Sequence, residues 1–344
     1  MFLSGRCFII AEAGSNHNGD LEQAKRLIDV AARAGVDAVK FQLFRADKLY
    51  LRSAGCSDYL QDSRSIYDIV SKMELPYEWL PELSAYSQQK GLQFMASVVD
   101  EESVDRLDPF VKVYKIPSYE MTHLPLIRTV ARRGKPVILA TGTASLEEVR
   151  ETVEDFFQTG NRQLMLMQCT AAYPAPLESL NVQAISTMKQ AFNVPVGLSD
   201  HSRDPLVGPL AAVSIGADLV EKHFTLSNEL PGPDHRFALN PEELCLMVRK
   251  IREVEKALGN GEKVTHPVEM ELRKFARRSI FAIRDIPKGQ PITAENVAVL
   301  RCGKLPAGLA PKELDRLLGR QARRFISAGS TVQHDDTAES NGNA

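Results

Sequence analysis

The sequence predicts an α/β protein: a (β/α)₈ TIM barrel followed by a small β-rich domain. Short apolar runs alternate eight times with helical patterns within about 260 residues, which is the usual size of such a barrel. After Leu258 the pattern changes to short strand-like runs separated by turn signals. A doubly wound open sheet is the alternative, but the chain has neither a GxGxxG nor a GxxxxGK[ST] motif.

The eight apolar runs are rich in β-branched residues, as is typical of parallel strands that are buried on both faces. We expect these strands at residues 8–13, 38–43, 93–98, 113–116, 136–140, 164–169, 194–198 and 219–223. Patterns with a polar outer face predict helices between them, among others at 21–33, 124–133, 146–158 and 241–258. The connection at 45–72 is longer than the others, and its place after the second strand predicts that it borders the active site.

Changes in composition divide the chain into four parts. We expect the barrel over residues 1–262, a charged linker over 263–278, the β-rich domain over 279–334 and a disordered polar tail over 335–344. A turn with the sequence Pro-Lys-Gly, at 287–289, separates two strand-like runs of the β-rich domain. A domain this small has a limited core, so it is expected to dock on another surface.

The charge balance and the cysteines limit the classes of function. The 344 residues include 42 Lys+Arg and 44 Asp+Glu, and this balance argues against a nucleic-acid partner. The chain has no run of 18 apolar residues and no signal-peptide pattern at its start, so no membrane association is expected. Five cysteines without CxxC spacing predict small buried thiols in a cytoplasmic protein. They are Cys7, Cys56, Cys169, Cys245 and Cys302.

Nearly every predicted strand has polar side chains at or just after its C-terminal end, where a barrel places its active site. Burying so many polar groups is costly, which argues against a purely structural role. The residues are Glu12, Lys40, Gln42, Ser97, Lys115, Ser118, Glu120, Tyr173, Ser199, Asp200, His201, Glu221 and His223.

Three kinds of chemistry follow from these residue types. Lys40 and Lys115 stand inside apolar strands, and together with the nearby serines they predict a site for a phosphate or carboxylate. His201 and His223 follow neighbouring strands and form a candidate metal pair suited to Mn²⁺, Zn²⁺ or Fe²⁺. Glu12 and Glu120 are candidates for general acid and base catalysis, although Glu120 could instead pair with Lys115.

Seven motifs and the loop that follows them carry a resemblance to a known family. In chain order the motifs are IAEAGSNHNGD, VKFQ, YKIPSYE, ILATGT, QCTAAYP, GLSDHS and EKHFT, with PGPDH after them. Together they resemble the sialic acid synthase family, and the C-terminal strings SIFAIRDIPKGQPIT and LRCG are similar to that family's antifreeze-like (SAF) domain. The resemblance covers residues 7–332 and implies a TIM barrel with a C-terminal SAF domain.

The resemblance implies a metal-dependent condensation of phosphoenolpyruvate with an N-acyl-hexosamine of the N-acetylmannosamine class. The implied products are a sialic-acid-type 2-keto-3-deoxy acid and phosphate, formed by cleavage of the C–O bond. The resemblance also implies a domain-swapped homodimer, in which Arg301 of one subunit reaches the sugar site in the barrel of the other.

Matching the motifs position by position implies a role for each residue. The metal, Mn²⁺ with Mg²⁺ or Co²⁺ as alternatives, is expected at His201 and His223. Catalysis is assigned to Glu12, Glu120 and Lys115. The other implied positions are Lys40, Ser97, Lys115, Ser118 and Ser199 for phosphoenolpyruvate and Gln42, Tyr173, Asp234 and Arg301 for the sugar.

Two positions depart from the sialic acid members of the family. Ala171 stands where they have Asn, and Ala140 stands where they have Ser. Ala171 is expected near the sugar, so the acceptor could be that of a legionaminic, pseudaminic or spore-coat-type nonulosonic acid synthase. A class I aldolase that uses Lys40 or Lys115 as a Schiff base is a further alternative. An inactive carbohydrate-binding or ice-binding protein is another, but the complete set of strand-end residues argues against it.

Overall fold

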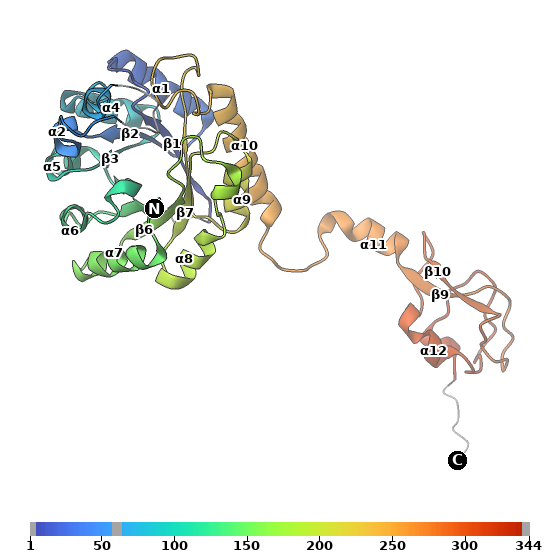
Figure 1. The fold of residues 1–344 in the computed structure, drawn as a ribbon. Coiled ribbons are helices and arrows are strands. Elements are labelled where there is room, and N and C mark those ends of the chain that lie inside the picture. Colours follow the sequence, from blue (N-terminus) through green and yellow to red (C-terminus); the bar gives the residue numbers. More distant parts are fainter. Residues whose placement is uncertain (1–4, 57–63, 339–344) are drawn as a thin grey trace. The chain divides into compact units, whose positions relative to one another are not determined.

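The computed structural model describes residues 5–56 and 64–338. The chain divides into two compact units, Met1–Asn260 and Gly261–Ala344 (Figure 1). Each unit is described by itself below.

A closed barrel of eight parallel strands forms the centre of the first unit, which confirms the predicted fold class (Figure 1). Each strand pairs with the next one along the chain, and β8 closes the barrel against β1. The strands are β1 (Phe8–Gly14), β2 (Ala38–Leu43), β3 (Gln93–Val98), β4 (Tyr114–Ile116), β5 (Val137–Ala140), β6 (Leu164–Cys169), β7 (Val196–Asp200) and β8 (Leu219–His223).

Helices cover the outside of the barrel (Figure 1). They are α1 (Leu21–Ala34), α4 (Leu80–Gln89), α5 (Glu101–Leu107), α6 (Leu124–Ala131), α7 (Leu146–Gln158), α8 (Ala184–Phe192), α9 (Val207–Ser214) and α10 (Pro241–Leu258). Local sequence fixes several of their ends: α7 and α10 begin with capping boxes at Ser145 and Asn240, and α1 ends at Gly35 with φ 77°. The short turns η3 (Asp108–Phe110), η4 (Ser118–Glu120) and η5 (Leu177–Ser179) lie in the connections.

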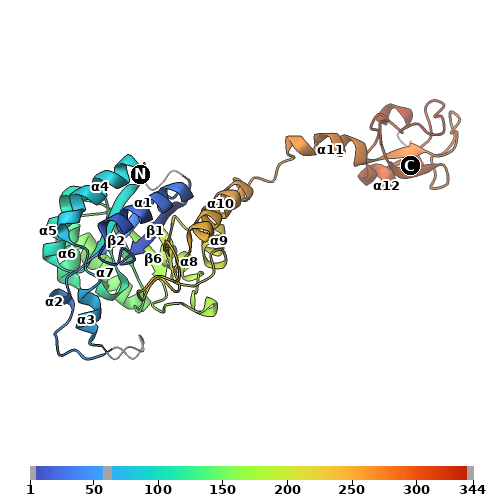
Figure 2. The same ribbon diagram turned by 90° about the horizontal axis from the view of Figure 1, so that it is seen from above.

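The long connection between β2 and β3 contains two short helices before α4. These are α2 (Ala46–Leu49) and α3 (Ile66–Ser71), and the 3₁₀ turn η2 (Tyr77–Trp79) follows them. Figure 2 shows α2 and α3 beyond one end of the barrel. Because they follow the C-terminal end of β2, this is the end at which a barrel carries its active site. Residues 57–63 of the predicted 45–72 insertion lie outside the described residues.

The inside of the barrel changes from apolar to polar along the strands. Ile10, Ala38, Met95, Ile138 and Leu219 belong to an apolar cluster that fills the interior nearer the N-terminal ends of the strands. Because side chains alternate between the two faces of a strand, the residue two positions further on also points inward. That next layer contains Glu12, Lys40, Ser97, Ala140 and Glu221, so the apolar cluster forms a floor beneath a polar chamber.

The second unit has an apolar core of its own. Its strands β9 (Arg278–Ala282) and β10 (Val297–Arg301) pair antiparallel, and isolated bridges join further segments to them. The remaining elements are η6 (Pro267–Glu269), α11 (Met270–Ala276), η7 (Pro311–Glu313), α12 (Leu314–Leu317) and η8 (His334–Asp336). The core residues are Ile280, Ala282, Ile286, Ile292, Val297, Leu309, Leu317, Ala322, Ile326 and Val332.

The structure differs from the sequence-based expectations at three places. Residues 263–278, expected as a linker, contain η6, α11 and the first residue of β9. Part of the expected disordered tail is folded, because Asp336 is buried and its carboxylate accepts the Gln333 backbone N–H at 2.7 Å. Strand β7 begins at Val196 rather than at 194, since Pro195 has no N–H to donate to the ladder, and it continues to Asp200.

Two predictions from composition can be compared with the structure. None of the helices within residues 5–56 and 64–338 has both the length and the apolar content needed to cross a membrane. The cysteines are all free thiols, but only Cys7, Cys169 and Cys302 are buried, whereas Cys56 and Cys245 are exposed. The expectation of small buried cysteines is therefore wrong for these last two.

Candidate active site

The polar chamber opens into a cavity of about 230 Å³ at the C-terminal end of the barrel. Strand register brings its residues together: Glu12 lies opposite Lys40 and His223, and Ser199 lies opposite Cys169 and Glu221. Most of the sequence-predicted site residues line this cavity. They are Glu12, Lys40, Gln42, Ser97, Lys115, Ser118, Glu120, Tyr173, Ser199, His201 and His223.

Two lysines and two glutamates form a buried charge cluster at the bottom of the cavity. Lys40 Nζ lies 2.8 Å from Glu12 Oε2 and 3.5 Å from Glu221 Oε1. Lys115 Nζ lies 3.6 Å from the same Glu221 oxygen, which also accepts a hydrogen bond from Ser199 Oγ at 3.2 Å. The other oxygen of Glu221, Oε2, is buried without a hydrogen-bond partner among the described residues. The cluster therefore has polar atoms that a bound ligand could engage.

Burial and the opposite charges shift the pKa values of this cluster in different directions. Burial raises the pKa of Glu12 to about 7, although Lys40 opposes the shift. Burial also lowers the pKa of Lys115. Burial acts to lower the pKa of Lys40, but the carboxylates of Glu12 and Glu221 raise it above its ordinary value. Glu12 can therefore exchange a proton near neutral pH, as general acid–base catalysis requires.

Glu221 behaves differently from Glu12. Burial acts to raise the pKa of Glu221, but the adjacent Lys115 and Lys40 hold it below its ordinary value. We therefore treat Glu221 as the charged carboxylate of the pair. Its strand position was recognised from the sequence, but it was not among the predicted catalytic residues. The alternation that makes Glu221 and His223 point the same way is the signal that could have identified it.

The serines surround the lysines. Ser97 and Ser118 are buried and line the cavity, and Ser118 Oγ accepts the backbone N–H of Gly142 at 3.0 Å. Gly142 has no room for a side chain, because an added Cβ would lie 2.8 Å from Ser118 Oγ. The segment that follows β5 thus packs closely on Ser118, and Ala140 at the end of β5 lines the cavity.

The two predicted metal ligands face each other across the β7–β8 pair. The ring centroids of His201 and His223 are 5.4 Å apart, and Tyr173 stacks on His201 with centroids 4.2 Å apart. His201 Nδ1 lies 2.9 Å from the Thr170 carbonyl oxygen and 3.7 Å from Cys169 Sγ. Donation from Nδ1 to this carbonyl leaves the lone pair of the ring on Nε2, which is the usual arrangement in a metal-binding histidine.

The residues present fit a metal ion that is held in part by other ligands. His223 Nδ1 is buried without a hydrogen-bond partner in the described residues, and Asp234 Oδ2 lies 3.7 Å from it. A buried polar atom without a partner is expected where another group completes the site. Over residues 5–56 and 64–338, no cluster of three His, Cys, Asp or Glu side chains is placed to hold a metal by itself. Two imidazoles would therefore leave positions for water or substrate.

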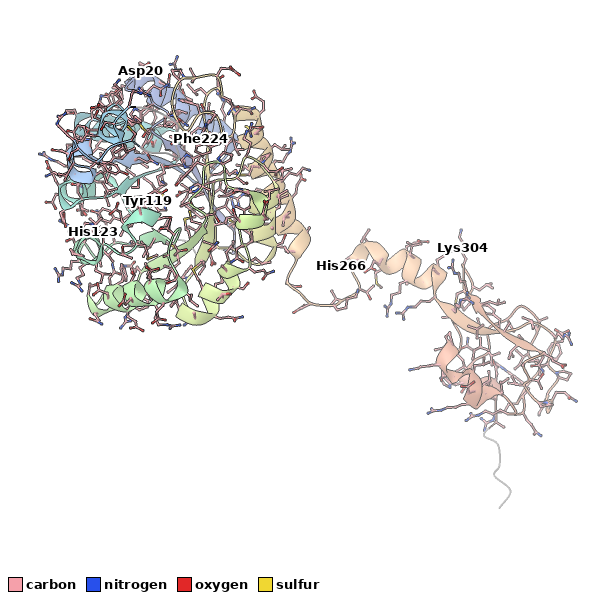
Figure 3. The ribbon with its side chains drawn as sticks, in the orientation of Figure 1. Asp20, Tyr119, His123, Phe224, His266 and Lys304 are labelled. Atoms are coloured by element: carbon pink, nitrogen blue, oxygen red, sulfur yellow. The ribbon has the colours of Figure 1, made fainter. Side chains whose placement is uncertain are left out.

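Glu120 sits at a less buried place than Glu12. It lines the cavity, and its Oε2 lies 3.5 Å from His123 Nδ1, whereas Lys115 contacts Glu221. The alternative that Glu120 pairs with Lys115 is thus replaced by a pair with His123. Burial raises the pKa of Glu120, against the opposing effect of His123. Figure 3 shows Tyr119 and His123 on the segment between β4 and α6.

Three of the predicted sugar residues line a second, outer cavity, and two of them, Gln42 and Tyr173, also line the chamber. Gln42 donates from Nε2 to Glu12 Oε1 at 3.2 Å, which couples it to the charge cluster. Burial raises the pKa of Asp234 to about 6. Gln42, Tyr173, His223 and Asp234 also line the outer cavity of about 240 Å³. Its other lining residues are Ile66, Ile69, Val70, Met73, Tyr119, Pro233, Arg236 and Phe237.

The sequence-predicted residues Asp200 and Arg301 are not among those that line the chamber. Asp200 was noted beside His201, but its side chain contacts Lys222 rather than lining the cavity. Arg301 ends β10 in the second unit and is exposed there. The role that the resemblance gives Arg301, in the barrel of a partner subunit, stays a prediction.

Comparison with known proteins gives two family matches that together span most of the chain. The model of the NeuB family matches residues 27–263, and the model of the SAF domain matches residues 277–337. The spore coat polysaccharide biosynthesis protein SpsE of Bacillus subtilis is 44% identical over 96% of this chain and 93% of its own length. An N,N'-diacetyllegionaminic acid synthase of Legionella pneumophila is 41% identical over 95% of this chain and 93% of that protein.

Solved structures agree with these matches. A crystal structure of N-acetylneuraminic acid (sialic acid) synthetase from Leptospira borgpetersenii, in complex with citrate, superimposes with a TM-score of 0.71. It is 32% identical in sequence and is matched over 78% of this chain and 91% of that chain.

Proposed function

The chain belongs to the NeuB family and carries a SAF domain, and from this premise we propose that it condenses phosphoenolpyruvate with an N-acyl-hexosamine. The products are a nine-carbon 2-keto-3-deoxy acid and inorganic phosphate. The buried cluster of Lys40, Lys115, Glu12 and Glu221 beside two imidazoles is the observation that supports this most directly. It offers positive charge for an anionic substrate and a carboxylate that titrates near neutral pH.

Phosphoenolpyruvate binds through its phosphate and its carboxylate. Lys40 and Lys115 supply the positive charge, and Ser97, Ser118 and Ser199 donate hydrogen bonds to the oxygens. The site lies in a buried chamber, where such contacts are stronger than in water and hold the enol carbon in place.

The aldehyde of the acceptor lies beside the imidazole pair. A divalent metal, Mn²⁺ by resemblance, would be held by His201 and His223 and would polarise this aldehyde as a Lewis acid. Gln42, Tyr173 and Asp234, which line the outer cavity, orient the rest of the sugar. The stacking of Tyr173 on His201 fixes the position of both rings.

The reaction forms one C–C bond and breaks one C–O bond. Carbon 3 of phosphoenolpyruvate attacks the aldehyde carbon, and the resulting positive charge on carbon 2 is met by water. Glu12 takes a proton from that water, since burial has placed its pKa at about 7. Glu120, whose pKa burial also raises, delivers a proton to the aldehyde oxygen. The phosphate then leaves carbon 2 with the bridging oxygen and the electron pair of the C–O bond, and the hydroxyl that water left on carbon 2 passes its proton to the departing phosphate and becomes the keto oxygen.

A second candidate acceptor is favoured by the outer cavity. Helix α3 and the residues after it present Ile66, Ile69, Val70 and Met73 to this cavity, directly beside the proposed sugar residues. A hydroxyl or phosphate placed against such a wall would lose hydrogen bonds to water without replacing them, which weakens binding. An acyl methyl group would instead strengthen binding, because its apolar surface is removed from water. An acceptor with a second acylamino group therefore fits this wall better than N-acetylmannosamine. The name N,N'-diacetyllegionaminic acid implies two such groups in the product of the Legionella relative.

The Schiff-base alternative requires an uncharged lysine. Lys115 meets this requirement better than Lys40, because burial lowers its pKa while two carboxylates raise that of Lys40. A Schiff base with pyruvate would be trapped on Lys115 by borohydride and would survive EDTA. The proposed reaction instead needs phosphoenolpyruvate and loses its rate when EDTA removes the metal.

A phosphate-release assay tests the proposed function. The protein is supplied with phosphoenolpyruvate, Mn²⁺ and one acceptor at a time: N-acetylmannosamine, its 6-phosphate or a diacetamido-hexose. We expect release that depends on the acceptor, and a product whose mass is the acceptor plus the elements of pyruvic acid. His223→Ala abolishes release, whereas the control His266→Ala, outside the barrel, retains it. Release that is independent of every acceptor, or retained in His223→Ala, would contradict the proposal.

A further inference from the structure

A second buried ion pair joins the strands that carry the two imidazoles, on the opposite face from the chamber. Lys222 Nζ lies 2.6 Å from Asp200 Oδ2, and the side chains of Lys222 and Asp200 are 1% and 0% exposed. The two residues are direct partners in the β7–β8 register. Each immediately precedes one imidazole, because His201 follows Asp200 and His223 follows Lys222.

The pair also holds the first turn of the chain after β7. Lys222 Nζ donates to the Ser202 carbonyl at 2.6 Å and to Ser202 Oγ at 3.1 Å, so all three of its N–H groups have acceptors. Asp200 Oδ1 accepts the Ser202 backbone N–H at 2.8 Å. Residues 200 and 202 are therefore both fixed to Lys222, and His201 stands between them. Its backbone has little freedom to shift relative to β8.

Helix α9 closes this cluster from outside and leaves no room for rearrangement. A Cβ added at Gly208 would lie 2.6 Å from Asp200 Oδ2, so the glycine lets the helix pack directly on the carboxylate. A buried ion pair contributes little net stability in general, because desolvation offsets the attraction. Its place one residue before each imidazole suggests a use other than stability.

We propose that Lys222, Asp200 and Ser202 form a positioning cluster that sets the distance and orientation of His201 and His223 for a shared divalent cation. These residues do not touch the substrate and act only through the two imidazoles. The inference rests on the proposed function, since that function requires the cation. Groups that hydrogen-bond a metal ligand directly change metal affinity by about 10–100-fold when they are removed, and this cluster, which holds the backbone of both ligands, is expected to reach the lower end of that range.

A control pair of the same residue types lies near the other ends of these two strands. Lys189 Nζ lies 2.7 Å from Asp218 Oδ2 and also donates to the Gly216 carbonyl, and Asp218 Oδ2 accepts the Val196 backbone N–H at 2.9 Å. This pair has the same residue types, but Lys189 belongs to α8, Asp218 immediately precedes β8, and their side chains are 32% and 23% exposed. It lies at the N-terminal end of the barrel, away from the imidazoles.

The experiment compares two double variants of the full chain. Asp200→Leu/Lys222→Met removes the cluster without leaving an unpaired buried charge, and Asp218→Leu/Lys189→Met makes the same change at the control pair. Mn²⁺ binding is measured by the EPR signal of the free ion, and thermal unfolding of the metal-free protein is followed in parallel. Phosphoenolpyruvate binding without metal is measured by calorimetry.

We expect Asp200→Leu/Lys222→Met to bind Mn²⁺ about 10-fold more weakly while its metal-free phosphoenolpyruvate affinity stays within twofold of wild type. The control pair is expected to change the unfolding temperature but not Mn²⁺ affinity. If Asp200→Leu/Lys222→Met does not fold, the single variant Asp200→Asn is measured, and it too is expected to bind Mn²⁺ more weakly.

Two results would overturn the inference, and only the second would also affect the proposed function. Unchanged Mn²⁺ affinity in a folded cluster variant would remove the positioning role and leave the proposed function standing. A wild-type protein that binds no Mn²⁺ would overturn the metal assignment of the proposed function, and this inference with it.

Discussion

Burial, more than any single charged neighbour, sets the titration of the polar side chains in the barrel. It is the largest influence on the pKa of Glu12, Lys115 and Glu120. A sequence does not state burial directly, but a charged residue inside an apolar strand implies it. Lys40 and Lys115 could therefore be identified from their apolar flanks, as their burial now shows. The roles of those residues in catalysis stay predictions.

Asp200 and Glu221 show where residue-level reasoning reaches its limit. Both are acidic and lie within two positions of a predicted metal ligand, so residue type alone does not separate them. The register places Asp200 beside Lys222, behind the strands, and Glu221 beside Ser199, inside the chamber. The difference follows from side-chain alternation: Glu221 points the same way as His223, whereas Asp200 lies beyond residue 198, where the predicted strand ended.

His17 provides a residue-scale prediction about pH and stability. It is fully buried, and burial lowers its pKa from 6.5 to about 4. A group whose pKa is depressed in the folded state contributes stability above its unfolded pKa and loses it as pH falls. The free energy of unfolding should therefore decline between pH 6.5 and about 4, with a loss of about 3 kcal/mol from this residue at the lower limit.

Denaturant unfolding of His17→Asn across this range tests the prediction. Asparagine keeps an acceptor for the Gly19 backbone N–H that His17 Nδ1 now accepts, but it does not titrate. The pH dependence of the variant should be flatter than that of wild type. Equal slopes for His17→Asn and wild type would show that His17 does not cause the acid instability.

At the scale of elements, strand and helix positions followed closely from periodicity, whereas the ends and the irregular connections did not. Six predicted elements, among them the second and eighth strands and α10, have the bounds that the structure shows. The helix α11 was expected as linker because its apolar residues, Met270, Leu272 and Phe275, are exposed and give little periodicity within a charged sequence. Helix α3 was not predicted, since its few apolar residues face a cavity rather than a core.

The close approach of β7 to β8 gives an element-scale prediction. A Cβ added at Gly197 would lie 2.1 Å from the Leu219 carbonyl oxygen, which is backbone and cannot rotate away. Gly197→Ala should therefore destabilise the barrel by about 3 kcal/mol or more, at the upper end of overpacking effects. Chemical denaturation with far-UV circular dichroism measures the change.

Gly160→Ala separates this steric effect from backbone strain. Gly160 has φ +91° and no heavy atom within 4 Å of an added Cβ, so its substitution adds conformational strain alone. It should cost about 1–2 kcal/mol, less than Gly197→Ala. A Gly197→Ala protein as stable as wild type would contradict the observed closeness of the two strands.

For the whole molecule, the sequence predicted a barrel and a separate small domain, and the structure shows two compact units with separate cores. How subunits assemble depends on surfaces that periodicity does not describe. We propose from the resemblance that two chains exchange their SAF domains, so that Arg301 of one subunit completes the sugar site of the other.

Mixing two inactive variants tests this exchange. His223→Ala damages the barrel site, and Arg301→Ala damages the contribution of the SAF domain. If the domains are exchanged, a mixed dimer contains one site with both residues intact, so random reassociation should restore about a quarter of wild-type activity. The assay is phosphate release after joint refolding. Activity that stays at the level of the separate variants would contradict the exchange.

The central claim is that the buried chamber joins phosphoenolpyruvate to an aldehyde with cleavage of the C–O bond. Phosphoenolpyruvate that carries ¹⁸O at the bridging position tests it most directly, with the products analysed by mass spectrometry. We predict that the released phosphate carries the label and that the new keto acid, with the combined carbon skeletons of acceptor and pyruvate, lacks it. Label retained in the keto acid, or pyruvate as the only carbon product, would contradict the account.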